Sequence, residues 1–140
     1  MASFEVVSAI VKTKYREIWA EWYAGTHAIP ARLQVEPLDV SSGYSHSQNL
    51  IIIGLPEGNL GDADILDENG WPIWKTELVH EMLHEWQSKT PCSPTGPAEV
   101  LCEQYVPAGC GQGHGPEFFQ AIIERTSYFE MTPEQLIEKL

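Results

Sequence analysis

Apolar residues near the start of the chain recur at steps of three and four positions. This is the spacing of one face of a helix, and it predicts a helix over residues 3–24. Ser3 is suited to cap the first turn, and Gly25 is suited to end the helix. The predicted buried face consists of Phe4, Val7, Ile10, Val11, Ile18, Trp19 and Trp22.

The pattern that follows is typical of strands. Apolar and polar residues alternate within residues 31–40, and Pro37 restricts this strand to an edge or a break of a sheet. Residues 43–49 are polar and predict a loop. The branched run Leu50–Ile53, which lies between turn residues, predicts a strand that is covered on both faces.

The middle of the chain predicts one long helix and two irregular segments. Gly, Asp and Asn residues indicate a loop over residues 54–70, with a possible short strand at 64–66. A helix is predicted over residues 72–89. The irregular segment 90–115 contains a possible short helix near 98–105.

Two further helices end the sequence. Residues 116–128 carry an apolar stripe of helical spacing, and Thr132 with Gln135 forms a capping-box pattern at the start of a last short helix. Together these elements predict an α+β protein in which helices pack around a small sheet.

The residues with candidate chemistry lie in the predicted helix 72–89. His80 and His84 are four positions apart, so both imidazoles lie on one face of the helix and can reach one metal ion. Glu81 is turned by about 100° around the axis from His80, where it can reach a water on the metal. The residues predicted to anchor the opposite side of the helix in the core are Val79, Leu83 and Trp86.

The identity of the third ligand separates the possible site types, because a catalytic zinc has three protein ligands and one open position. The metzincin spacing requires Gly at position 87 and His at position 90, and the chain has Gln87 and Thr90, so that class is excluded. The remaining candidates for the third ligand are Glu99, Glu103 and His114.

The neighbours of His114 favour the histidine. Gly113 and Gly115 allow the backbone to bend tightly around the imidazole. Pro116 suits the first turn of the next helix, and Glu117 suits the positive end of that helix. These residues place a third histidine at the foot of a helix.

The combination of His80-Glu-Met-Leu-His84 with Gly-His114-Gly-Pro-Glu-Phe resembles the SprT-like (Spartan-type) zinc metalloprotease domain. That family joins an H-E-x-x-H helix to a third histidine in an H-G-x-x-F segment that opens a later helix. The resemblance implies a zincin-like fold and one metalloprotease domain over residues 1–140. The positions that it maps to functional residues are His80, His84 and His114 as zinc ligands and Glu81 as the catalytic glutamate.

The implied reaction is hydrolysis of peptide bonds by a zinc-activated water, with Glu81 as the general base. The substrate is expected to lie extended along a sheet edge, for which Leu50–Ile53 is the nearest candidate strand. Tyr105 and Tyr128 are candidates for stabilising the oxyanion, or are packing aromatics.

Composition and charge limit the partners. The chain has 140 residues, the size of one domain, and it has no apolar run long enough to span a membrane and no signal-peptide pattern. We therefore expect a cytoplasmic protein.

The net charge of −12 opposes binding to a phosphate backbone, so the expected partner is a protein or peptide substrate. The alternative function is a catalytically inactive acidic binding protein, for example a nucleic-acid mimic, on a degenerate zincin fold.

The three cysteines do not form a pattern for a zinc ribbon, which many SprT-like proteins carry after the protease domain. Because no secretion signal is present, we expect Cys92, Cys102 and Cys110 to be free thiols. The rival interpretation is a structural Cys₃His zinc site that uses these cysteines and His114.

Overall fold

The structure is a computed structural model that describes residues 3–37, 41–55, 70–106 and 113–140. The chain divides into two compact units, one of residues 1–82 with 139–140 and one of residues 83–138. The boundary between the units falls inside helix α2 (Ile73–Lys89), which is continuous across it. The predicted α+β class is confirmed, with an N-terminal helix, a small mixed sheet, the helix that carries His80 and His84, and a later segment that carries His114.

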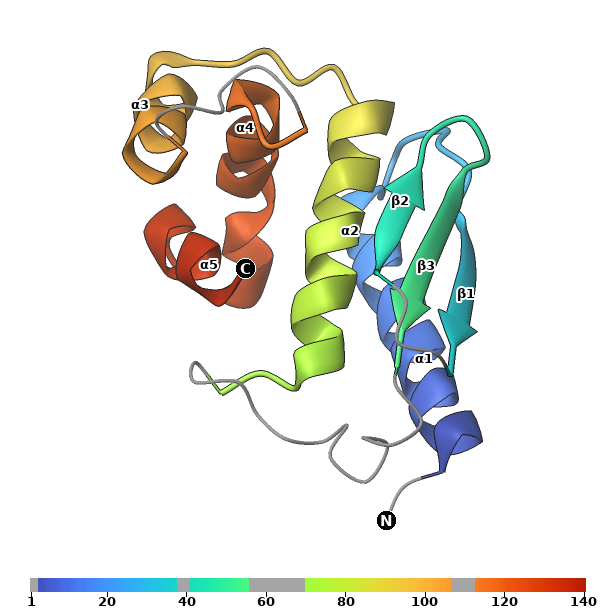
Figure 1. The fold of residues 1–140 in the computed structure, drawn as a ribbon. Helices are drawn as coiled ribbons and strands as arrows, with labels where there is room; N and C mark the ends of the chain where they lie inside the picture. The colour runs from blue at the N-terminus through green and yellow to red at the C-terminus, as the bar shows by residue number, and fades with distance from the viewer. Residues whose placement is uncertain (1–2, 38–40, 56–69, 107–112) are drawn as a thin grey trace. The chain divides into compact units, whose positions relative to one another are not determined.

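The first unit is built on a three-stranded sheet (Figure 1). The strands are β1 (Arg32–Glu36), β2 (Gly43–Ser45) and β3 (Leu50–Gly54), in the order β1-β3-β2. Strand β1 pairs with β3 in parallel, and β2 pairs with β3 in antiparallel fashion. Strand β1 ends at Glu36, before Pro37, so it is shorter than the predicted 31–40. The predicted edge position is confirmed, because β1 pairs with β3 alone among the described strands.

Helix α1 (Phe4–Trp22) contacts strand β1. The predicted N-cap is confirmed, since the N–H of Val6 donates to Oγ of Ser3 at 3.3 Å. Gly25 has a φ of +79°, a conformation that suits glycine just beyond the end of a helix. The hydroxyl of Tyr15 accepts the N–H of Ala31 at 2.9 Å, which connects the helix to the start of β1.

Strand β3 is the centre of the sheet, and the predicted cover on both faces is complete on one face and partial on the other, where Leu50 is buried and Ile52 is half-buried. Ile51 and Ile53 are fully buried. The prediction of a loop over residues 43–49 is wrong for Gly43–Ser45, which pairs with β3 and forms strand β2. These three residues have no strand-like alternation, so the sequence did not indicate a strand that depends on pairing with β3. The prediction of a substrate strand at Leu50–Ile53 is also wrong, since β3 pairs with β1 on one side and β2 on the other and has no free edge there.

In its described residues, the second unit contains the last turns of α2 and three further helices. These are α3 (Gly96–Tyr105), α4 (Pro116–Arg125) and α5 (Pro133–Lys139), with a 3₁₀ turn over Thr126–Phe129. The prediction of one helix over residues 116–128 is therefore wrong in its last turn, which is 3₁₀. The possible strand at 64–66 lies outside the described residues.

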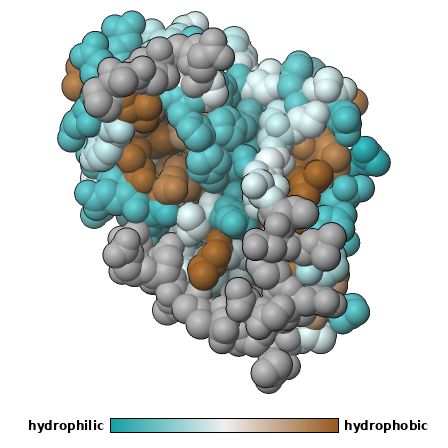
Figure 2. All heavy atoms as spheres, in the orientation of Figure 1, coloured by the Kyte–Doolittle hydropathy of each residue, from teal (hydrophilic) through white to brown (hydrophobic). Residues whose placement is uncertain are grey.

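Two features of the second unit bear on its packing. The capping box before α5 is confirmed by reciprocal bonds, in which Gln135 N–H donates to Thr132 Oγ1 at 3.2 Å and Thr132 N–H donates to Gln135 Oε1 at 2.8 Å. Apolar side chains are visible near α4 and α5 (Figure 2), and an apolar hollow of about 420 Å³ is lined in part by Val100, Leu101 and Ile123.

No helix in the described ranges is long and apolar enough to cross a membrane.

Candidate metal centre

Helix α2 positions two of the three histidines. Leu78, Val79, Met82 and Leu83 are fully buried, which fixes the rotation of the helix about its axis. His80 and His84 are one helical turn apart and half-buried. The predicted anchoring of the helix is confirmed, because Trp86 is also buried.

The third histidine is held by the start of α4. Gly113 has a φ of +50°, a conformation that favours glycine, and Gly115 is the N-cap of the helix, with Pro116 in its first turn. The His114 ring lies 4.9 Å from the His84 ring and 4.7 Å from the Phe118 ring, measured between centroids. Phe118 therefore packs against both imidazoles, since its ring is 4.6 Å from that of His84.

The last turns of α2 are tied to α4 within the second unit. The indole N–H of Trp86 donates to Glu124 Oε2 at 2.8 Å, and the Arg125 guanidinium lies 4.2 Å above the Trp86 ring. These contacts join the helix of His84 to the helix that His114 precedes, and His114 itself is exposed.

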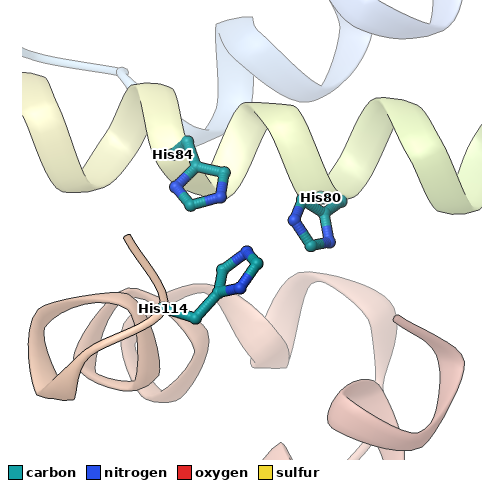
Figure 3. Close-up of side chains that lie close together, drawn as sticks. All are labelled: His80, His84 and His114. Carbon is teal, nitrogen blue, oxygen red and sulfur yellow. The ribbon is translucent and has the colours of Figure 1, made fainter. Parts of the chain in front are cut away.

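The three imidazoles converge (Figure 3). One nitrogen from each of His80, His84 and His114 belongs to a group in which all three atoms lie within 4.8 Å of one another. Three nitrogens on a tetrahedral zinc, at about 2.1 Å from the metal, lie about 3.4 Å apart. Small rotations of the side chains cover the difference, so the donor set and its geometry fit a zinc ion or another metal that imidazole binds.

Gln87 fixes the ring of His84. Its Oε1 lies 3.2 Å from Nδ1 of His84, and when Nδ1 carries the proton it donates to this oxygen and leaves the Nε2 lone pair available to a metal. Burial lowers the pKa of His84 below its ordinary value, the bond to Gln87 opposes this shift, and the neighbouring His114 adds to it. The net effect keeps the imidazole neutral, which is the form that binds a metal.

Glu81 is buried and faces a cavity. Its side chain is only 6% exposed, and it has no hydrogen-bond partner among the described residues. Burial, with a smaller contribution from the negative charge of Glu77, raises the pKa of Glu81 to about 7. The cavity measures about 310 Å³ and is lined by Ser41, Ser42, Thr76, Glu77, His80, Glu81 and Leu140.

The structure separates the candidates for the third ligand. His114 joins His80 and His84, whereas Glu99 and Glu103 are exposed on α3 and belong to no metal-binding group in the described part of the chain. Tyr128 packs edge-on against Phe129, with centroids 5.0 Å apart.

The cysteines differ from the expectation of three free thiols. Cys92 is free, but Cys102 is disulfide-bonded, and Cys110 lies outside the described residues. The rival Cys₃His site is wrong, because a disulfide sulfur is not a thiolate ligand and because His114 lies with His80 and His84.

Three residues near the site were not predicted as site residues from the sequence. Gln87 could have been found from its position three residues after His84 on one helix face. Ser42 and Glu77 are 35 residues apart in the chain, and no local pattern indicates that the hydroxyl of Ser42 donates to the carboxylate of Glu77.

Comparison of the chain with known protein families, with curated proteins and with solved structures finds no match. The resemblance to the SprT-like domain therefore stays a prediction from the two histidine motifs.

Proposed function

We propose that this chain is a zinc-dependent metallopeptidase of SprT-like type, in which His80, His84 and His114 bind the metal and Glu81 is the general base. The observation that carries the proposal is the convergence of the three imidazoles beside a buried carboxylate that has no hydrogen-bond partner among the described residues. A purely structural metal site has no need of such a carboxylate.

A zinc ion held by these histidines would supply Lewis-acid chemistry, through an activated water and a polarised substrate carbonyl. Glu81 accepts the proton that the attacking water loses, and then gives it to the nitrogen of the departing amine. The Glu81 carboxylate lines the same cavity as His80, so it faces the space where that water and the scissile bond would lie.

Strand β2 is the best-placed element for binding the substrate backbone. Among the described strands it pairs with β3 alone, so its outer edge can accept an extended peptide by strand addition. Ser41 and Ser42 come directly before β2 and line the cavity with His80. A peptide on this edge would therefore pass close to His80.

The charge of the chain favours a protein or peptide substrate over a nucleic acid. The net charge is −12, with 8 basic and 20 acidic residues, so few cations are available to neutralise phosphates.

The experiment is digestion of an unfolded protein, such as denatured casein, with the zinc-loaded chain. We expect new peptide fragments in mass spectra, no fragments after removal of the metal with a chelator, and recovery of cleavage when zinc is restored. An absence of fragments from the zinc-loaded chain, with a full complement of metal, would contradict the proposal.

A further inference from the structure

Glu77 is an acidic residue of the cavity that the proposed reaction does not use. It lies on α2 one helical turn before Glu81, and both carboxylates line the cavity with His80. Glu77 is half-buried, and burial raises the pKa of its carboxyl group while a hydrogen bond from Ser42 opposes this shift. Partial burial disfavours the ionised carboxylate, and a cation in the cavity would compensate its charge.

The carboxylate of Glu77 is held in a fixed direction. Ser42 Oγ donates to Glu77 Oε2 at 2.9 Å. The same Ser42 oxygen accepts the N–H of Gly54, at the end of β3, at 3.2 Å. The carboxylate is thus connected to the sheet through one hydroxyl, and none of the described residues donates a hydrogen bond to its Oε1.

The two lysines that neighbour residues of the cavity do not line it. Lys75 precedes Thr76 and Lys139 precedes Leu140, but their ammonium groups lie over the Trp71 ring, at 4.6 and 5.0 Å from its centroid. The described lining therefore holds two carboxylates, three hydroxyls, one imidazole and Leu140, and no lysine or arginine.

We propose that Glu77 is a specificity-determining residue that binds the ammonium or guanidinium group of a lysine or arginine in the substrate, next to the peptide bond that is cut. This inference rests on the proposed peptidase function and names the substrate class of the same site. The volume of about 310 Å³ is at the small end of ligand pockets and is enough for one long side chain.

The chemistry of the lining suits such a side chain. The apolar stem would pass Leu140, and the charged end would bind the Oε1 of Glu77 and the neighbouring hydroxyls. Loss of a hydrogen bond to a charged group changes affinity or rate by about 10- to 100-fold. The net charge of −12 also attracts basic peptides from solution.

The test has two readouts. In the first, the zinc-loaded chain digests a peptide library, and the residues that flank each cut are identified by mass spectrometry. We expect lysine or arginine at one fixed position beside the cut. A peptide in which norleucine replaces that lysine should then be cut about 10- to 100-fold more slowly, as judged by kcat/KM.

The second readout is binding without turnover. The zinc-loaded Glu81→Gln chain should bind the lysine peptide about 10-fold or more tightly than the norleucine peptide. The added change Glu77→Gln should abolish that difference. Ser42→Ala, which removes the hydroxyl that supports the carboxylate and accepts the N–H of Gly54, should reduce it in part. Glu103→Gln is the matched control, because it removes the same charge from an exposed position on α3.

The outcomes are distinguishable. Cleavage of the library with no basic residue beside the cut, or a preference that survives Glu77→Gln in a chain with normal zinc content, would overturn the role of Glu77 alone. A zinc-loaded chain that cuts no peptide and binds both peptides equally would overturn both proposals.

Discussion

Two neighbouring turns of helix α2 each carry a His-Glu pair, His80-Glu81 and His84-Glu85. The two glutamates differ in whether a cation pairs with them. Glu85 is completely buried, and its Oε2 accepts a hydrogen bond from the Lys89 ammonium at 2.6 Å. Glu81 is 6% exposed and has no hydrogen-bond or ion-pair partner among the described residues. Both residues are buried, but only Glu85 has a compensating charge, whereas Glu81 lines the cavity.

The difference is the one expected between a structural carboxylate and a carboxylate that reacts or binds. A buried carboxylate is tolerated when a cation pairs with it, as at Glu85. An unpaired carboxylate is costly and is kept where it reacts or binds. Because Glu81 lines the cavity together with His80, its missing partner is best supplied by the substrate, the water or the metal of the site.

The largest expected difference between Glu81 and Glu85 is their effect on peptide hydrolysis when each is exchanged for glutamine. Glu81→Gln should lower kcat by about 10²- to 10⁴-fold with normal zinc content, because it removes the proton acceptor and leaves the ligands. Glu85→Gln should retain near wild-type kcat for each folded, zinc-loaded molecule. A Glu81→Gln chain with wild-type kcat would show that Glu81 is not the base.

The ion pair between Glu85 and Lys89 is tested by removing the ammonium group of Lys89. Lys89→Met leaves Glu85 buried without its cation and should lower the free energy of unfolding by about 3–5 kcal/mol in urea titrations. Lys14→Met is the matched control. It breaks the exposed ion pair with Glu17, whose side chains are 37% and 54% exposed, and should cost at most about 1 kcal/mol. Equal losses in both variants would contradict a structural role for the buried pair.

Removal of the charge of Glu81, which has no ion-pair partner among the described residues, is expected to stabilise the metal-free fold. In the metal-free protein at about pH 8, Glu81→Gln should raise the free energy of unfolding by about 1–2 kcal/mol, because it removes a buried charge that lacks a partner. Chemical denaturation in the presence of a chelator measures this effect. A metal-free variant that is less stable than the wild type would show that Glu81 supports the fold.

The smallest expected effect is a pH dependence that reports on Glu77. Burial raises its pKa above the ordinary value of 4.5, so the folded chain holds this proton more tightly than the unfolded chain does. The contribution of Glu77 to stability is therefore largest below pH 4.5 and is lost as the pH rises through the raised pKa. Glu77→Gln does not titrate, so its stability relative to the wild type should increase over that interval. A difference between the two proteins that is constant from about pH 4 to about pH 8 would contradict this assignment.

Features with local causes could be predicted from the sequence. The Ser3 cap, the capping box at Thr132 and Gln135, and the common face of His80 and His84 each depend on residues within one or two turns. Features that depend on distant partners could not be predicted in the same way. Strand β2 exists through its pairing with β3, and the orientation of Glu77 depends on Ser42.

The third histidine lies between these cases. His114 is 30 residues beyond His84, and no helical period relates the two. Its flanking glycines and proline favoured His114 over Glu99 and Glu103 as the third ligand, and the fold brings the three rings together.

The number of zinc ions per chain, determined by elemental analysis, tests directly whether the three histidines form one metal site. We expect about one zinc in the wild type and in His27→Ala, which removes an exposed histidine outside the group, and little zinc in His114→Ala. A full complement of zinc in His114→Ala, or none in the wild type, would contradict the claim.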